Sequence, residues 1–304
     1  MKYRSEIDGL RAVAVVPVIL FHAGFERFSG GFVGVDVFFV LSGYLITTIL
    51  LAEIAEGRFS LIRFYERRAR RILPALYFVM LVTLPFAFRL MLPDEFASFA
   101  QALISVLFFV SNVYFWQTTD YFSRAAEESP LLHTWSLGVE EQYYMLFPLG
   151  LLLLWRLGPR GALAGLIAGS LASLALAEYG VHRWPVPTFF LLPTRAWELG
   201  LGSLAAFYLT RRGLARIPAR FGGGAAALGL AMILASVALF DAETPFPSLY
   251  ALLPTVGTVL VVLYADPGAL AGRLLSWRPV VFVGLISYSA YLWHQPLFAF
   301  ARIT

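Results

Sequence analysis

Ionisable side chains lie inside two segments of this sequence that are otherwise apolar enough to cross a bilayer. Arg11 and His22 stand near the two ends of the first apolar run, and Asp36 stands near the start of the second. The first two are about three helical turns apart, about 16 Å of rise, so both should point to one face with His22 deep in the membrane. A titratable group at that depth normally faces a cavity or a partner, so the pattern predicts a functional site.

A second cluster is basic and lies in the stretch FYERRARRILPA, residues 64–75. Its arginines, among them Arg67, Arg68 and Arg71, recur at helical spacing and would cover much of a short helix at the inner membrane surface. Guanidinium groups at such a place suit bidentate contacts to phosphate oxygens. Membrane topology alone also requires a basic cytoplasmic loop, which can bind anionic lipid headgroups, so the spacing leaves both interpretations open.

Two adjacent acids, Glu140 and Glu141, enter a later apolar segment in the stretch LLHTWSLGVEEQYYMLFP, residues 131–148. Acids in the first turns complement the helix dipole, which explains one acid but not the pair. Arg195 and Glu198 are spaced for a salt bridge within one helical turn, and a structural role is the simpler interpretation. The polar residues that we expect along a substrate path are Ser42, His133, Trp135, Ser136, Arg195, Glu198, Tyr291 and His294.

The elements that carry these residues are predicted to be membrane-spanning helices. The chain has 304 residues, of which 59% are hydrophobic and 14% charged, and its mean hydropathy is +0.74. Its apolar runs are about 18–22 residues long, which fits helices rather than the alternating strands of a barrel. We therefore predict one all-α integral membrane domain over residues 1–304, a polytopic bundle of about nine to ten transmembrane helices.

Arginine placement predicts how the bundle is oriented. The arginine-rich loop 55–71 should be cytoplasmic, which puts the N-terminus inside as well. If every apolar run crossed the membrane, the later arginine-rich loops would lie outside. We therefore expect a segment between 97 and 136 to re-enter the membrane rather than cross it.

Missing residue types and motifs exclude several kinds of site. The sequence has no cysteine, which rules out disulfides, thiolate metal sites and a cysteine nucleophile. It also contains no HExxH or Cys/His metal spacing, no Gly-rich phosphate loop and no G-x-S-x-G turn. We expect neither a metal cofactor nor a nucleic-acid partner.

Taken together, these clusters resemble the membrane-bound acyltransferase 3 family, integral-membrane enzymes that O-acetylate exported glycans such as lipopolysaccharide O-antigen, exopolysaccharide and peptidoglycan. The matching stretches run in family order over essentially the whole chain: IDGLRAVAVVPVILFHAG, GGFVGVDVFFVLSGYLIT, FYERRARRILPA, HTWSLGVEEQYYMLFP, PTRAWELGLG and ISYSAYLWHQPL. Family members usually continue with a further span, and some with a periplasmic SGNH hydrolase-like domain. We expect this chain, which stops at Thr304, to lack both.

The resemblance implies a reaction and assigns roles to the clusters. An acyl group, most often acetyl, passes from acyl-CoA on the cytoplasmic side to a glycan hydroxyl on the outer side of the bacterial inner (plasma) membrane. The histidine of the family's first span corresponds to His22, and its acids correspond to Asp36 and to Glu140 or Glu141. The candidates for binding the acetyl-CoA donor are Arg11, Arg67, Arg68 and Arg71.

Acyl transfer needs a base for the hydroxyl proton and donors for the developing oxyanion. Because an imidazole titrates near neutral pH, we predict that His22 is the general base or a transient acyl carrier, with Asp36 or Glu141 orienting its ring. Ser42 and Ser136 are competing nucleophiles without an evident adjacent base. A polytopic transporter or flippase for a lipid-linked glycan or small molecule is the main alternative. A scaffold for glycan enzymes is another, and it would tolerate loss of His22.

Overall fold

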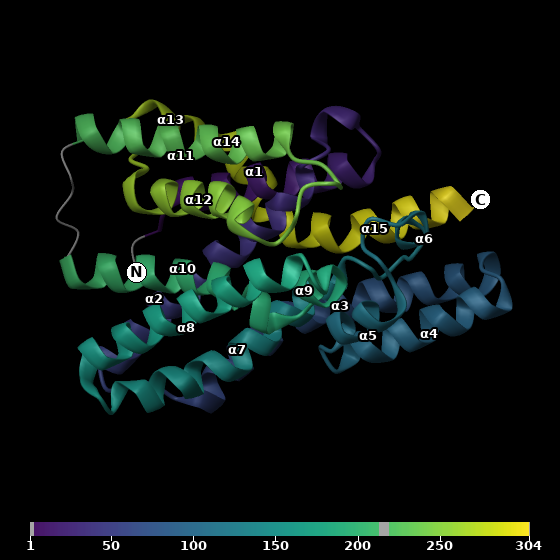
Figure 1. Ribbon diagram of the computed structural model, residues 1–304, viewed down its shortest axis with the longest axis horizontal. Coiled ribbons are helices and arrows are strands. Elements are labelled where there is room, and N and C mark those ends of the chain that lie inside the picture. Colours follow the sequence, from purple (N-terminus) through teal and green to yellow (C-terminus); the bar gives the residue numbers. More distant parts are fainter. Residues whose placement is uncertain (1–2, 213–218, 304) are drawn as a thin grey trace.

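The structure is a computed structural model that describes residues 3–212 and 219–303, and these residues form only helices, turns and connecting segments. Figure 1 shows the long helices lying side by side, mostly along the long axis of the molecule. The prediction of an all-α protein is confirmed for this part of the chain. The α-helices are α1 (Ser5–His22), α2 (Gly34–Ala55), α3 (Leu61–Leu90), α4 (Pro93–Leu107), α5 (Ser111–Thr118), α6 (Arg124–Glu127), α7 (Thr134–Trp155), α8 (Gly158–Val181), α9 (Pro185–Phe190), α10 (Leu192–Arg212), α11 (Ala219–Leu239), α12 (Leu252–Tyr264), α13 (Leu270–Leu275), α14 (Arg278–Leu285) and α15 (Ser287–Ile303), and the 3-10 turns are η1 (Glu26–Phe28), η2 (Gly31–Val33) and η3 (Leu249–Ala251).

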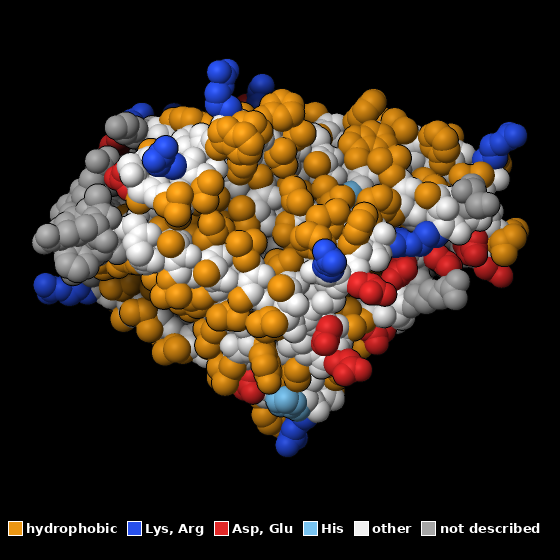
Figure 2. Space-filling model, turned by 90° about the horizontal axis from the view of Figure 1, so that it is seen from above, with side chains coloured by type: hydrophobic (Ala, Val, Ile, Leu, Met, Phe, Trp, Pro, Cys, Tyr) orange, Lys and Arg blue, Asp and Glu red, His pale blue; other side chains and the backbone are white. Residues whose placement is uncertain are grey.

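Among the described residues, four helical stretches are long and apolar enough to cross a membrane. They are Glu26–Ala55, Leu61–Leu90, Gly158–Val181 and Gly222–Leu239. Figure 2 shows hydrophobic side chains over most of one face of the molecule, a surface that suits contact with lipid. The protein therefore has the helices of a multi-pass membrane protein, while the number of nine to ten crossings stays a prediction.

Short helices occupy the segment for which re-entry is predicted. α4 has 15 residues, α5 has 8 and α6 has 4. Crossing the hydrocarbon core takes about 20 helical residues, so none of these helices is long enough to cross alone. Re-entry itself stays a prediction.

A break in the helix between α9 and α10 leaves backbone carbonyl groups that side chains satisfy. Leu191 is extended at this point, and the carbonyl oxygen of Phe189 accepts a hydrogen bond from Nε of Arg195 at 2.9 Å. The hydroxyl of Thr194 donates to the carbonyl oxygens of Thr188 at 2.7 Å and of Leu191 at 2.9 Å. Carbonyl groups freed at a buried helix end need such partners. The first turn of α10 thereby fixes the end of α9.

α2 and α10 pack backbone against backbone. A Cβ atom on Gly43 would lie 1.9 Å from the carbonyl oxygen of Leu199, and one on Gly202 would lie 1.9 Å from that of Val40. Such contacts are too short for any residue but glycine. Small residues at helix crossings allow this approach in membranes. The pair brings the start of α2 next to the start of α10, where the charged residues of both helices meet.

We expect Gly43→Ala to destabilise the protein, because the new methyl group meets the Leu199 carbonyl group, which cannot move aside. Overpacking of this kind costs about 1–3 kcal/mol, so the unfolding midpoint of the protein in detergent should fall by several degrees. Gly169→Ala on α8 is the matched control, since a Cβ there meets nothing within 4 Å. Thermal unfolding followed by circular dichroism measures both variants, and equal midpoints would contradict the close packing.

Candidate active site

Three of the four histidines of the chain meet inside the bundle. His22 ends α1, His133 directly precedes α7, and His294 lies in the middle of α15. The ring centroids of His22 and His294 are 5.0 Å apart, and those of His133 and His294 are 5.4 Å apart. All three side chains are buried, and His22 is the most accessible at 8% exposed. The fold thus gathers the three into one cluster, called the histidine cluster below.

Hydrogen bonds orient two of these rings. Nδ1 of His22 lies 2.9 Å from the carbonyl oxygen of Val18 and 3.2 Å from Nε2 of His294, and its Nε2 lies 3.1 Å from the hydroxyl of Tyr121. A carbonyl oxygen only accepts, so in the neutral ring Nδ1 donates and Nε2 accepts from Tyr121. Nδ1 of His294 lies 2.6 Å from the carbonyl oxygen of Tyr291, which leaves its Nε2 as an acceptor. The basic nitrogen of the His22 ring, Nε2, therefore faces Tyr121, and that of His294 faces Nδ1 of His22.

The imidazole of His133 lies beside this pair. Neither of its ring nitrogens has a hydrogen-bond partner among the described residues. Its backbone carbonyl oxygen accepts from the hydroxyl of Tyr291 at 2.9 Å, and that hydroxyl also lies 2.7 Å from the hydroxyl of Ser136. Within residues 3–212 and 219–303, no group of three or more His, Asp or Glu side chains is arranged to hold a metal ion. The hydroxyls of Tyr291 and Ser136 thus form a hydrogen-bonded chain beside this ring.

One cavity, called the inner cavity below, reaches the histidine cluster from the side of the arginines. Its volume is about 140 Å³, and its wall includes Arg11, Arg68, Arg71, Ser42, Glu140, His133 and Tyr291. Arg11 also pairs with Asp8 at 2.8 Å, and the guanidinium of Arg68 lies 5.1 Å from the ring centroid of Tyr144. Three of the four arginines predicted to bind the donor therefore share one cavity.

The fourth arginine, Arg67, lies elsewhere. Its guanidinium is half exposed and pairs with Glu53 at 2.6 Å. Arg68 and Arg71 are one helical turn apart, so they share a face of α3, whereas Arg67 projects about 100° away from its neighbour. The structure therefore places Arg67 on the outer surface of the arginine cluster.

The two acids of α7 differ in their surroundings. Glu140 lines the inner cavity and accepts hydrogen bonds from the hydroxyls of Ser42 and Tyr144. Glu141 is buried, and its Oε1 has no hydrogen-bond partner among the described residues. Neither acid is among the hydrogen-bond partners of the His22 ring, which are Val18, Tyr121 and His294.

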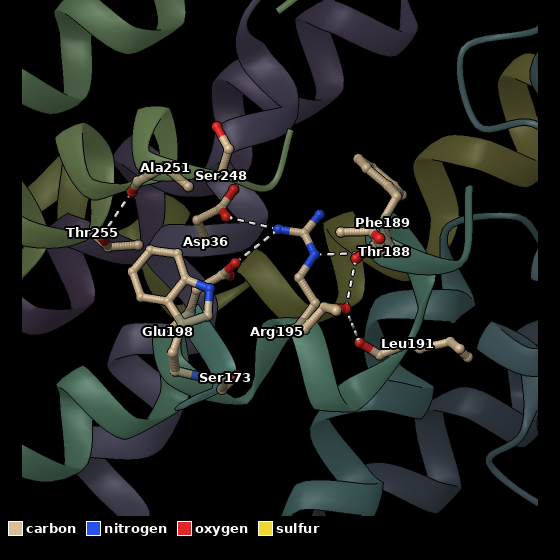
Figure 3. A network of polar contacts seen from close by, with 12 residues as sticks. Asp36, Ser173, Thr188, Phe189, Leu191, Arg195, Glu198, Ser248, Ala251 and Thr255 are labelled. Carbon is tan, nitrogen blue, oxygen red and sulfur yellow. Dashed lines mark hydrogen bonds and ion pairs between the residues drawn. The ribbon is translucent and has the colours of Figure 1, made fainter. Parts of the chain in front are cut away.

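Asp36 also lies apart from His22, in a buried ion network on Arg195. Nη1 of Arg195 lies 3.0 Å from Oδ1 of Asp36 and 2.9 Å from Oε1 of Glu198, and all three side chains are at most 1% exposed. Figure 3 shows both carboxylates approaching the guanidinium while Phe189 lies on its other side. The ion pair within α10 that the spacing predicts is present, and Asp36 joins it from α2.

Aromatic rings surround the same guanidinium. Its carbon lies 4.7 Å from the ring centroid of Phe189, 5.2 Å from that of Phe246 and 5.3 Å from that of Trp135. Trp135 is 1% exposed and packs against Phe189 with ring centroids 4.8 Å apart. Cation–π contacts are strongest where the cation is desolvated, as here. Trp135, Arg195, Glu198 and Asp36 thus hold aromatic side chains in place rather than lining the inner cavity.

A second cavity, called the outer cavity below, lies on the other side of these aromatic rings. Its volume is about 350 Å³, and its wall includes Asp120, Tyr121, Phe122, Phe189, Phe246 and Glu243. Tyr121 links it to the histidine cluster, because this residue lines the cavity and its hydroxyl contacts Nε2 of His22.

Sequence reasoning missed Tyr121 as a site residue. The residue is 6% exposed, and it lies within the polar stretch from Gln117 to Pro130. An aromatic residue near a predicted membrane boundary has an ordinary explanation in the interfacial aromatic belt. Only the fold shows that this tyrosine reaches a histidine 99 positions earlier in the sequence.

A family model described as an acyltransferase domain, the acyltransferase 3 model, matches residues 4–303. The chain belongs to the acyltransferase 3 family. No solved structure matches the chain.

The relatives that this chain matches are named as O-acetyltransferases. The chain is 34% identical over 312 residues to the O-acetyltransferase OatA of Staphylococcus aureus, covering 99% of this chain and 51% of that protein. It is 34% identical to the peptidoglycan O-acetyltransferase OatA of Listeria monocytogenes (97% and 49% covered). It is 33% identical to the putative peptidoglycan O-acetyltransferase YrhL of Bacillus subtilis (97% and 49% covered). The chain thus spans about half the length of these relatives.

The ion network gives a prediction about stability. Arg195→Met should destabilise the protein by roughly 3–5 kcal/mol, because it leaves two carboxylates buried without their cation. Adding Asp36→Asn and Glu198→Gln to the same variant removes the uncompensated charge and should restore part of the loss. Unfolding midpoints in detergent measure both effects; a triple variant no more stable than the single one would contradict an electrostatic role.

Proposed function

We propose that this protein is an O-acyltransferase that moves an acetyl group from acetyl-CoA in the inner cavity to a hydroxyl of a cell-envelope glycan. The observation that carries the proposal is the position of His22 between two cavities. Its Nε2 is joined through Tyr121 to the outer cavity, and its Nδ1 is joined through His294 to Tyr291 in the wall of the inner cavity. The names of the relatives support acetyl transfer and a peptidoglycan-type acceptor.

The topology that suits this reaction is a multi-pass protein of the bacterial plasma membrane with a cytoplasmic N-terminus. The protein would cross the membrane about nine to ten times as a single domain, with the segment between 97 and 136 re-entering. Acyl-CoA then meets the arginines from the cytoplasm, and the acceptor approaches His22 from the outer side.

The inner cavity supplies what a CoA donor needs. Arg11, Arg68 and Arg71 present guanidinium groups at one wall, and such groups pair with phosphate oxygens in bidentate geometry. The path from these arginines toward the histidine cluster passes the hydroxyls of Ser136 and Tyr291. A thioester held there with its carbonyl near His133 would find an imidazole whose ring nitrogens have no other partner in the described chain.

In the proposed step the acceptor oxygen attacks the thioester carbonyl carbon while its proton passes to Nε2 of His22. The carbon–oxygen bond forms, the carbonyl oxygen becomes an oxyanion, and a neighbouring N–H or O–H donor stabilises that charge. The carbon–sulfur bond then breaks, and the proton held by His22 neutralises the departing CoA thiolate. The products are an O-acyl ester and free CoA, and His22 returns to its neutral state.

His22→Ala should abolish transfer, because general-base catalysis contributes typically 10²–10⁴-fold. Membranes that contain the protein are incubated with isotope-labelled acetyl-CoA, and alkali-labile ester is measured in the extracted glycans and lipids. The variant must reach the membrane in wild-type amount and bind CoA. Full ester formation without His22 would overturn its role, and substrate transport without any ester would favour the transporter alternative.

Arg71→Ala should raise the KM for acyl-CoA roughly tenfold or more, since a hydrogen bond to a charged group contributes about 1.5–3 kcal/mol. The turnover number should change much less, because the phosphates lie far from the reacting carbon. Arg70→Ala is the matched control: Arg70 lies one position earlier on α3 but is exposed and paired with Glu66 at 2.8 Å. Equal KM values for the two variants would argue against donor binding in the inner cavity.

A further inference from the structure

We infer that the outer cavity binds the acceptor and that the part of the acceptor held there is an uncharged sugar ring. The inference rests on the proposed function and adds to it the place and the charge of the acceptor. It is carried by the connection of this cavity to His22, by its aromatic floor and by the sign of the charges at its rim.

The outer cavity has the size and the connection that an acceptor site needs. Its volume of about 350 Å³ is within the range of small-molecule sites. Among the described residues it shares no wall residue with the inner cavity, so two substrates could be bound at once. The side chain of Tyr121 lies between the outer cavity and His22, with 3.1 Å between its hydroxyl and Nε2 of His22. A hydroxyl bound near Tyr121 is therefore close to the base that the reaction requires.

The floor of the outer cavity is aromatic and rigid. The ring of Phe189 lies 4.4 Å from that of Tyr121 and 5.5 Å from that of Phe122, between centroids. Behind it, the guanidinium of Arg195 packs on the rings of Phe189 and Phe246 and hydrogen-bonds the Phe189 carbonyl oxygen. Binding sites for small molecules combine such aromatic surfaces with a few polar groups. The apolar C–H face of a sugar ring fits a floor of this kind.

The rim of the outer cavity is acidic. Asp120 and Glu243 are exposed at its wall. His182 also lines the cavity, but its Nε2 lies 3.6 Å from a carboxylate oxygen of Glu178, so it adds no unopposed positive charge. Carboxylates accept hydrogen bonds from hydroxyl and amide groups and repel anions. The rim therefore favours a neutral ring over one that carries phosphate or carboxylate.

The charges of the two cavities are opposite, and this difference assigns each substrate to its side. The arginine wall of the inner cavity attracts the phosphates of CoA, whereas the acids of the outer rim repel them. A neutral sugar lacks the charge that the arginines attract, and it can donate hydroxyl hydrogens to Asp120 and Glu243. Donor and acceptor are thus prevented from occupying each other's site.

Binding without a donor tests the inference directly. N-acetylglucosamine and N-acetylglucosamine 6-phosphate are titrated separately against the full chain in nanodiscs, with saturation-transfer NMR as the readout. The neutral sugar should bind roughly tenfold or more tightly than its phosphate, and Asp120→Asn combined with Glu243→Gln should remove most of that preference. Glu128→Gln is the matched control, because this exposed acid of the same region does not line the cavity.

A second variant locates the binding. Val186→Trp puts an indole into the outer cavity from its partly exposed wall, and it should abolish sugar binding while CoA binding persists. Equal affinity for the two sugars, or sugar binding that survives Val186→Trp, overturns the inference. If the inference fails in this way but acetyl transfer persists, the proposed function stands. If the sugar binds in the outer cavity but no transfer occurs, the proposed function is overturned and the binding site is supported.

Discussion

One buried guanidinium, that of Arg195, holds together the elements on which both sides of the site depend. It joins α2 through Asp36, α10 through Glu198, and the end of α9 through the Phe189 carbonyl oxygen. Its faces pack against rings that come from α7 and from the segment before η3. Burying an ion carries a penalty of several kcal/mol unless partners compensate it. Here Oδ2 of Asp36 and Oε2 of Glu198 have no hydrogen-bond partners in the described chain, so the network is only partly satisfied. The network instead fixes positions: Arg195 holds the rings of Phe189 and Phe246 at the floor of the outer cavity and binds the carbonyl oxygen at the end of α9.

The histidine cluster depends on that floor through Tyr121. The ring of Tyr121 packs on Phe189 at 4.4 Å, and its hydroxyl reaches Nε2 of His22. The direction of the hydrogen bonds then follows from two carbonyl oxygens, those of Val18 and Tyr291, which can only accept. Both Nδ1 atoms must donate, so both Nε2 atoms accept. The backbone of α1 and α15 thus decides which nitrogen of each ring is basic, and no carboxylate is needed for this purpose.

The sequence predicts the chemistry of this site better than it predicts which residues contact one another. The helical class, the clustering of polar residues in apolar segments and the common face of Arg68 and Arg71 follow from local spacing, which the fold preserves. The pairing of Asp36 with Arg195 joins positions 159 apart, and the contact of His294 with His22 joins positions 272 apart. Such contacts depend on how helices pack, which local patterns do not specify. Sequence spacing therefore predicts that Asp36 orients His22, the nearest histidine in the sequence. In the structure Asp36 pairs instead with Arg195 of α10.

The same reasoning explains why the structure places Arg67 and Tyr121 differently from what their residue types suggest. Arg67 belongs to a run of arginines, so its residue type implied a shared function, but one step along a helix turns a side chain by about 100°. Tyr121 has an ordinary interfacial setting, so its residue type implied none. In both cases the direction of the side chain decides its contacts. The guanidinium of Arg67 reaches Glu53, and the hydroxyl of Tyr121 reaches His22.

Buried histidine and tyrosine rings lie between the two cavities, and their burial limits the access of water. His22, His133 and His294 are 8%, 2% and 4% exposed, so bulk water has little access to the point where the cavities approach each other. A thioester that met water beside a basic imidazole would be hydrolysed, and exclusion of water is a general means of preventing this loss. The hydroxyl of Tyr121, which lines the outer cavity, contacts Nε2 of His22. In the proposed reaction an acceptor hydroxyl would displace or share that contact before its proton reaches His22, so that a bound acceptor has access to this nitrogen and passing solvent does not.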